Sequence, residues 1–419
     1  MVRNENVAWN ERKCNFEPPG ADEKSSVTEE MKGKAVIFVT AFLFSTPSSS
    51  HARNTYTMNR NISLIVCTLF VNVTLIFAQP EISSHSSTQR QPKGGPRGGR
   101  VTSIADATKD PAAVQRLALS HRNLSTLSDS VGLFVNLVEL DLSGNPITEL
   151  PQELAKCTKL VKVNLAQTKI TSIPTVLKSL PALTSLNLTG TPLAALDARA
   201  FDGLTRLKEL YLDGTKLTTL PQSLGSALSL TMLSASANAL TEVPAWIGNL
   251  RQLRMLRLSN NNITVIPASF GNLHMLTDLD VANNNLKAIP DTVYHLPALR
   301  SINVSGNTLQ KLPEYLNSQE LRELRADSCG LTVIPPSIGN LKNLAFLSVS
   351  NNGLKTIPEE IERCQSLTRL DLSDNPLEGL PIRSLAKLQG LAELRIVQRN
   401  PSLDREPQQK PEGRPKPKK

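Results

Sequence analysis

The sequence has few cysteines and few aromatic residues, with five Cys and 4% Phe, Trp and Tyr in 419 residues. So few thiols exclude a disulfide-dense scaffold, and the cysteines show no Cys-x-x-Cys pair or other zinc-ligand spacing. The sequence also lacks a glycine-rich phosphate loop, a catalytic-triad motif and a histidine-based metal motif. We therefore predict that the chain is not an enzyme and has no catalytic residue, no cofactor and no metal.

The sequence contains a repeat with a period close to 23 residues, on the pattern LxxLxLxxNxLxxLP. The units start at Val114, Leu137, Leu160, Leu183, Leu207, Leu230, Leu253, Leu276, Leu299, Leu321, Leu344, Leu367 and Leu391. The spacing is 24 residues after Leu183 and Leu367, and 22 after Leu299. Units of this size bury their leucines only against neighbouring units, so we predict one solenoid and not several separate domains.

Each unit predicts a short strand followed by a turn. Leu256 and Leu258 are two residues apart and therefore lie on one face of a strand, and Asn261 follows them at the turn. An Asn side chain both donates and accepts, so a column of Asn is expected to form a ladder that satisfies buried peptide groups. That column contains Asn145, Asn238, Asn261, Asn284, Asn307, Asn352 and Asn375, with Thr168, Thr191, Thr215 and Cys329 in the remaining units.

These units resemble the leucine-rich repeat family over residues 114–397, in about 13 units. The resemblance implies an α/β fold: a horseshoe-shaped solenoid with a parallel concave β-sheet and an irregular or short-helical convex side. It also implies binding of other proteins. The segments VPAWIGNL, IPASFGNL and IPPSIGNL are similar to the 23-residue intracellular type found in Ras-pathway scaffolds and Scribble-like polarity proteins. This subtype implies a scaffold in intracellular signalling or complex assembly.

The third and fifth positions of each unit alternate with the buried leucines, so their side chains are expected to project from the concave sheet. Most of these side chains are small or polar, and six stand out as candidates for contact with a protein partner. They are Tyr211, Met232, Met255 and Arg257 in consecutive units and, separately, Arg325 and Phe346. Large adaptable apolar groups beside Arg suit an interaction hot spot. The alternative is that single apolar residues are scattered over a long surface by chance.

Two further groups have structural interpretations. Asp278 and Asp280 face Arg254 and Arg257 one unit earlier, so we expect a cross-strand charge pair and not a metal site. Cys157 and Cys364 occupy a position that holds Leu in other units, so we expect small buried thiols. Free thiols favour a reducing compartment.

The ends of the chain differ in composition from the repeats. We expect residues 1–113 to be low in complexity and mostly disordered, and residues 398–419 to form a basic, Pro-rich disordered tail. The hydrophobic segment 62–78 has three interpretations. It is a signal peptide ending near Ala78 if translation starts at Met58, a marginal membrane anchor if translation starts earlier, or the translation of an unspliced intron.

These observations favour a cytoplasmic adaptor that binds a protein partner, soluble or tethered by 62–78, with no small-molecule substrate. The alternative is a secreted or cell-surface receptor for peptide or glycan, which is consistent with Asn-x-Ser/Thr sequons at Asn123, Asn187, Asn262 and Asn303. A third hypothesis, binding of RNA through the basic ends of this +9 chain, is less favoured, because such flanks are usually solvated and disordered. The sequence does not predict the oligomeric state.

Overall fold

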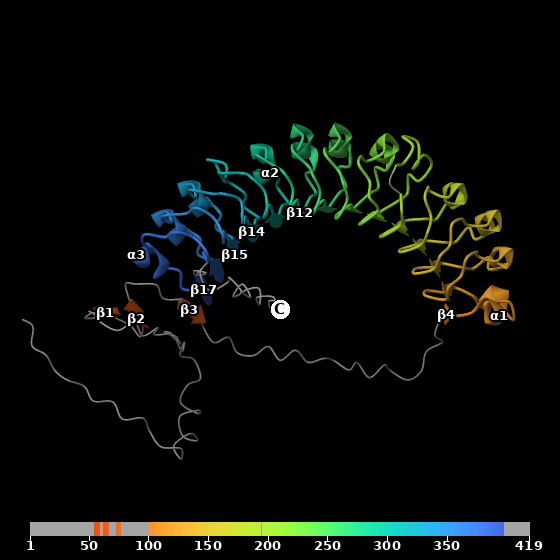
Figure 1. Ribbon diagram of the computed structural model, residues 1–419, viewed down its shortest axis with the longest axis horizontal. Coiled ribbons are helices and arrows are strands. Elements are labelled where there is room, and N and C mark those ends of the chain that lie inside the picture. The colour runs from red at the N-terminus through yellow and green to blue at the C-terminus, as the bar shows by residue number, and fades with distance from the viewer. Residues whose placement is uncertain (1–53, 59–61, 67–72, 77–99, 194, 398–419) are drawn as a thin grey trace, which may run out of the picture.

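The structure is a computed structural model that describes residues 54–58, 62–66, 73–76, 100–193 and 195–397. Residues 100–397 form an arc of stacked units, with short strands lining its inner edge and turns and short helices on its outer edge (Figure 1). Neighbouring strands from β4 to β17 pair in parallel and in chain order. The predicted solenoid with a parallel concave sheet is therefore confirmed.

The inner strands are two to four residues long. They are β4 (Arg100–Val101), β5 (Arg116–Ala118), β6 (Glu139–Asp141), β7 (Lys162–Asn164), β8 (Ser185–Asn187), β9 (Glu209–Tyr211), β10 (Met232–Ser234), β11 (Met255–Arg257), β12 (Asp278–Asp280), β13 (Ser301–Asn303), β14 (Glu323–Arg325), β15 (Phe346–Ser348), β16 (Arg369–Asp371) and β17 (Glu393–Ile396). Their central leucines lie in register, as in Leu210, Leu233 and Leu256, and are fully buried. The core is thus a continuous row of aliphatic side chains, mostly leucine, that no single unit could form.

The outer edge carries one short helix in most units. These helices are α1 (Ile104–Ala107), η1 (Pro111–Ala113), η2 (Asp129–Leu133), η3 (Gln152–Lys156), η4 (Thr175–Ser179), η5 (Gln222–Ser226), η6 (Ala245–Asn249), η7 (Ala268–Asn272), α2 (Asp291–Tyr294), η8 (Pro336–Asn340), η9 (Glu359–Arg363) and α3 (Ile382–Leu385). A proline precedes most of them; Pro267, for example, has φ −70° before η7. The ring fixes φ where the chain enters the helix.

Two units of irregular length differ from the others on the outer edge. Among the described residues, no helix is formed between β8 and β9 or between β13 and β14, where the spacings are 24 and 22 residues. In both places a serine of the following unit accepts a hydrogen bond from a backbone N–H: Ser223 Oγ from Phe201 and Ser337 Oγ from Leu316, each at 3.0 Å. The change in length is absorbed on the outer edge, and the strands keep their register.

The turn after each strand requires an unusual backbone conformation. The residue just before the Asn-ladder position has a positive φ, between 52° and 70°, in twelve consecutive units. These residues are His121, Gly144, Gln167, Gly190, Gly214, Ala237, Asn260, Asn283, Gly306, Ser328, Asn351 and Asp374. Gly and Asn adopt this left-handed region at the lowest cost, which explains their frequency at this position.

The solenoid begins before Val114, the first residue of the array in the sequence alignment. Strand β4 pairs in parallel with β5, so the predicted boundary between residues 113 and 114 lies inside the stacked sheet. At the other end, β3 (Val73–Ile76) pairs antiparallel with β17. Strands β1 (Asn54–Met58) and β2 (Ile62–Val66) form a separate antiparallel pair.

The hydrophobic segment 62–78 therefore contributes two of the described strands, β2 and β3. Within the described ranges, no helix combines the length and the hydropathy that crossing a bilayer requires. The other residues of this segment, most of 1–99 and the predicted tail 398–419 lie outside the described residues.

Candidate partner-binding face

The Asn column ties consecutive units together and is not free to contact a ligand. Asn261 Nδ2 donates to Leu258 O at 2.9 Å in its own unit and to Ala235 O at 3.0 Å in the preceding unit. Its Oδ1 accepts from Leu240 N at 3.1 Å. The other six Asn of the column make the same type of contacts with the preceding unit. Their amides thus satisfy buried peptide groups on both sides.

The concave columns carry more negative than positive charge, although the whole chain has a net charge of +9. The carboxylates at the third, fifth and seventh positions of the units are Glu139, Asp141, Glu209, Asp213, Asp278, Asp280, Glu323, Asp327, Asp371 and Glu393. The cations are Arg100, Arg116, Lys162, Arg257, Arg325, Arg369 and Arg395, with Arg100 of β4 in register with Arg116. Ten carboxylates against seven cations give this face a net charge of −3. The basic character of the chain therefore comes from elsewhere.

The structure brings four of the predicted contact residues together on β9–β11. Met232 lies in register with Met255, and Ser234 lies in register with both Tyr211 and Arg257, one strand away on either side. Tyr211, Met232 and Met255 are half-buried and Arg257 is exposed. We call these four residues the central patch. They form one continuous surface, as expected from their columns.

The phenol of Tyr211 sits among charged neighbours. Burial raises its pKa, the carboxylates of Glu209 and Asp213 raise it further, and the guanidinium of Arg257 lowers it. The phenol therefore stays protonated at neutral pH and can both donate and accept a hydrogen bond. Tyr211 thus offers a partner an apolar ring and a polar tip on the same side chain.

The predicted charge pair between Asp278 or Asp280 and the arginines of the preceding unit is wrong. Within the described residues, neither carboxylate forms an ion pair. Each is engaged locally: Asp278 accepts from Thr277 Oγ1 at 2.6 Å, and Asp280 accepts from Ala282 N at 3.1 Å. These neutral donors bind the carboxylates without neutralising their charge.

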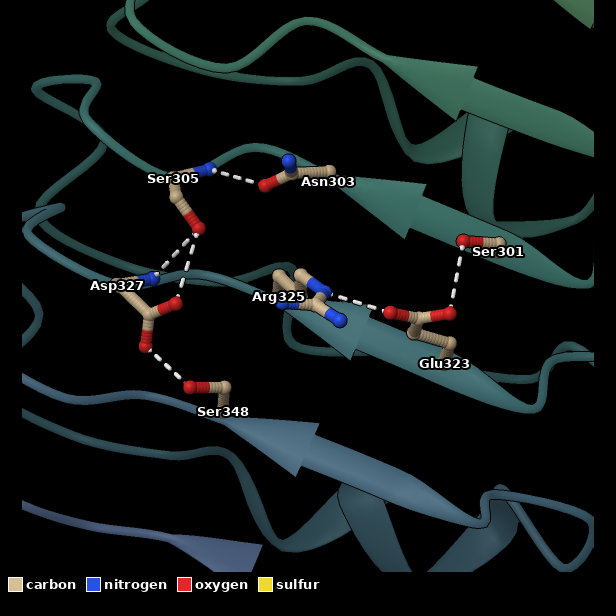
Figure 2. Close-up of polar contacts among 7 residues, drawn as sticks. All are labelled: Ser301, Asn303, Ser305, Glu323, Arg325, Asp327 and Ser348. Carbon is tan, nitrogen blue, oxygen red and sulfur yellow. Dashed lines mark hydrogen bonds and ion pairs between the residues drawn. The ribbon is translucent and has the colours of Figure 1, made fainter. Parts of the chain in front are cut away.

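The other two predicted residues, Arg325 and Phe346, lie on β14 and β15, separated from the central patch by β12 and β13. The Arg325 guanidinium lies 4.7 Å from the centroid of the Phe346 ring, and Arg369 of β16 lies 4.6 Å from it. Arg325 also pairs with Glu323, which accepts from Ser301 at 3.4 Å (Figure 2). We call Arg325, Phe346 and Arg369 the arginine–phenylalanine stack.

Sequence inspection did not select Arg369. Arg369 occupies the same column as Phe346, one unit later. This position alone would have been enough to predict that the two side chains are neighbours. Two cations over one aromatic ring form cation–π contacts that orient both side chains. Asp327 was also missed as a structural residue: it accepts from Ser305 Oγ and Ser348 Oγ and so links β13, β14 and β15 (Figure 2).

The three described thiols are buried and not paired in disulfides. Cys157 Sγ donates to Val131 O at 3.3 Å, Cys364 Sγ to Ile338 O at 3.2 Å, and Cys329 Sγ to Val304 O at 3.3 Å. Burial raises the pKa of Cys157 and Cys329 to about 11 and that of Cys364 to about 12. Thiols held neutral in this way are poor nucleophiles and poor metal ligands.

Two pockets lie on the outer edge, at the two units in which the described residues form no helix. One, of about 250 Å³, is lined by residues that include Ile289, Tyr294, Leu312 and Tyr315. The other is lined by residues that include Arg199 and Trp246. No group of three or more His, Cys, Asp or Glu that could hold a metal ion occurs among the described residues. The pockets are therefore remote from the concave columns and carry no recognisable catalytic set.

Comparisons with known proteins agree with this geometry. The family described as leucine rich repeat matches residues 135–193, 181–240, 251–309 and 319–396. In a comparison with curated proteins, nothing matches. Among solved structures, the plant peptide hormone receptor RGFR1 in complex with RGF2 is 29% identical with a TM-score of 0.58, over 69% of this chain and 48% of the receptor chain.

Two more distant structures share the fold alone. The internalin InlF of Listeria monocytogenes is 22% identical with a TM-score of 0.54, over 68% of this chain and 88% of its own. The Toll–Spätzle complex of Drosophila is 23% identical with a TM-score of 0.54, over 68% of this chain and 43% of that chain. Since the family segments cover more than half of the residues, the chain belongs to the leucine-rich repeat family.

Proposed function

We propose that the chain is a non-enzymatic adaptor or scaffold that binds a protein partner on its concave face. The observation that carries this proposal is the central patch, in which Tyr211, Met232 and Met255 lie on three consecutive strands, partly exposed, on a sheet surface that is otherwise mostly polar. Clustered aromatic and Met side chains beside an Arg are typical of interaction hot spots.

A structural relative supports binding of a polypeptide. RGFR1, which is 29% identical to this chain over the matched region, was solved in complex with RGF2. The match spans about half of that receptor, so only the solenoid is comparable. A parallel sheet curved around its inner edge offers an extended surface suited to a protein or peptide ligand.

We place this adaptor in the cytoplasm, in signalling or complex assembly. The support is the resemblance of the outer segments to the 23-residue intracellular type and the presence of three free thiols, Cys157, Cys329 and Cys364. Buried thiols without disulfide partners are compatible with a reducing compartment. The hydrophobic segment 62–78 would add a tether if it is retained in the mature chain.

The second candidate function is that of a secreted or cell-surface receptor for peptide or glycan. It is favoured by the relationship to RGFR1 and by two exposed sequons, Asn123 and Asn262, where a glycan would not cover the concave strands. The sequons at Asn187 and Asn303 lie in β8 and β13, on the concave sheet. Glycans at those two positions would block the face that both hypotheses use.

The interaction is tested by a Met232→Asp/Met255→Asp variant of the full chain, expressed in its own cells and compared with wild type by quantitative affinity purification. The matched control is Val265→Asp/Met275→Asp, because these residues are 62% and 36% exposed and lie outside the concave columns. Each patch substitution is expected to cost about 2 kcal/mol of binding free energy. Partners that wild type and control capture equally, but that the patch variant loses, support the proposal. Unchanged capture by a folded patch variant contradicts it.

The intact mass and the N-terminal peptide of the protein purified from its own cells distinguish a cytoplasmic protein from a secreted or cell-surface one. An N-terminus near Gln79 together with N-glycan mass would support the secreted or cell-surface receptor and contradict the cytoplasmic adaptor. An unglycosylated chain, with or without residues 62–78, would support the cytoplasmic adaptor.

A further inference from the structure

One row of the concave sheet has carboxylates at both ends and apolar side chains between them. Glu209, Met232, Met255 and Asp278 occupy the same column on β9–β12 and lie in register from strand to strand. All four are half-buried and therefore still partly accessible. We call this row the acidic–methionine row.

The carboxylates of this region form no ion pair with any described residue of the chain. Among the described residues, Glu209, Asp213, Asp278 and Asp280 form no ion pair, and neither does Arg257, the one cation at these column positions on β9–β12. Four carboxylates and one guanidinium leave β9–β12 with a net charge of −3 on this face. Elsewhere on the sheet, carboxylates such as Glu139, Glu323 and Glu393 pair with arginines.

We infer that the concave face recognises a segment of a protein partner in which two basic residues flank large apolar residues. This inference rests on the proposed function and specifies its partner. The methionines accept apolar side chains of varied shape, and unpaired carboxylates at both ends attract cations. The negative sign of the face excludes a nucleic acid backbone as the ligand of this row.

The spacing of the row sets the spacing of the basic residues in the partner. Adjacent strands lie about 4.8 Å apart, so Glu209 on β9 and Asp278 on β12 are separated by roughly 14 Å. An extended segment advances about 3.3 Å per residue, so about four residues separate its two basic positions. The segment crosses the strands, with its apolar residues over Met232 and Met255.

The basic C-terminal tail of this chain competes for the same surface but does not fit all of it. Its one large apolar residue, Leu403, is six residues beyond Val397, which limits its reach to about 20 Å. Met255 on β11 lies six strand spacings from β17, roughly 29 Å along the sheet. The tail can bring charge to the carboxylates but not an apolar side chain to the methionines. It therefore lacks the apolar part of the segment that the row is inferred to bind.

The test is selection of a phage-displayed library of random twelve-residue peptides on the full-length protein, followed by fluorescence anisotropy with the enriched peptides. The expected result is enrichment of two Lys or Arg, three to five residues apart, around Leu, Ile, Met or Phe. Binding should weaken about tenfold or more in an Asp278→Asn/Asp280→Asn variant and should fall with rising salt. The matched control is Glu139→Gln/Asp141→Asn, which removes carboxylates from the same two columns on β6. It should bind as wild type does.

The other outcomes separate this inference from the proposed function. If the enriched peptides are neutral or acidic and still require Met232 and Met255, the proposed protein-binding function stands. The inference that the partner segment is basic is then wrong. Peptides unaffected by Met232→Asp/Met255→Asp would overturn both. If peptides bind only after deletion of 398–419, and the free tail peptide displaces them, the tail is the natural occupant and the inference fails. Failure to enrich any peptide on either form of the protein also overturns it.

Discussion

Gly248 and Ser269 touch across consecutive units on the outer edge of the solenoid. A β-carbon added to Gly248 would lie 2.5 Å from the backbone oxygen of Ser269 and 2.7 Å from its β-carbon. Gly339 stands in the same relation to Glu360 O, at 2.5 Å. The glycine of these segments therefore allows η6 to pack on η7 and η8 on η9.

Gly248→Ala is expected to destabilise the solenoid, because the methyl group overlaps backbone that belongs to a stacked neighbour and cannot move alone. Overpacking of this kind costs about 1–3 kcal/mol. Urea unfolding followed by circular dichroism measures the change. The control is Gly379→Ala, since nothing lies within 4 Å of a β-carbon at that site. Equal midpoints for the two variants would show that the contact between units is not tight.

The left-handed turn provides a pair of substitutions with opposite expected signs. Ala237 has φ +55° and Gly214 has φ +64° at equivalent positions of adjacent units. A β-carbon at Gly214 would meet no atom closer than 4.0 Å, so strain there comes from the backbone alone. Ala237→Gly should therefore stabilise by about 0.5–1 kcal/mol, and Gly214→Ala should destabilise by a similar amount. Changes of the same sign in urea unfolding would contradict this account of the turn.

The regular part of the fold could be predicted because one spacing specifies it. Residues equivalent to Leu256, Leu258 and Asn261 recur at a nearly fixed period, and each unit stacks on the previous one. The repeated Leu positions therefore predict the core, and the repeated Asn position predicts the ladder. The outer edge of the irregular units could not be predicted. A gain or loss of one residue between strands does not reveal that Ser223 and Ser337 satisfy the backbone in place of a helix.

The candidate site was predictable as columns but not as contacts. Register alone placed Met232 beside Met255 and Tyr211 near Arg257. It did not predict that Asp278 accepts a hydrogen bond from Thr277, or that both Arg325 and Arg369 lie over the ring of Phe346. These contacts depend on which rotamer each side chain adopts and on which of several nearby donors it binds. A sequence alignment of the repeats contains neither kind of information.

The ladder predicts that Asn and Thr units differ in their contribution to stability. Asn284 Nδ2 donates to Leu258 O of the preceding unit and to Val281 O, both at 3.0 Å, and its Oδ1 accepts from Ile263 N at 3.0 Å. Thr191 Oγ1 donates to Leu188 O of its own unit at 2.6 Å. Asn284→Ala leaves the buried Ile263 N–H of the preceding unit without a partner. Leu258 O and Val281 O each lose one of two side-chain donors, because Asn261 and Asn307 still donate to them.

We expect Asn284→Ala to cost about 2 kcal/mol, since a buried group left unsatisfied costs about 1–3 kcal/mol. Thr191→Ala should cost about 1 kcal/mol or less, because Leu188 O keeps the hydrogen bond from Thr191 N. Urea unfolding of both variants, with the slope m checked for loss of cooperativity, tests the difference. A smaller effect at Asn284 than at Thr191 would contradict the role assigned to the cross-unit bonds.

The buried thiols predict a loss of stability in alkali. Burial holds the pKa of Cys364 at about 12 and that of Cys157 at about 11, against an ordinary value of 9.0. As pH rises above about 9, the unfolded chain releases these protons while the folded chain retains them, so the free energy of unfolding falls through the folded pKa values. Urea unfolding between pH 8 and 10.5 should show this fall, and a Cys364→Ala variant should show a shallower one.

In native protein at pH 8, iodoacetamide labelling read by peptide mass spectrometry should leave Cys157, Cys329 and Cys364 unmodified, and all three should label in urea. Rapid labelling of any of them in the folded protein would mean that its unit opens readily.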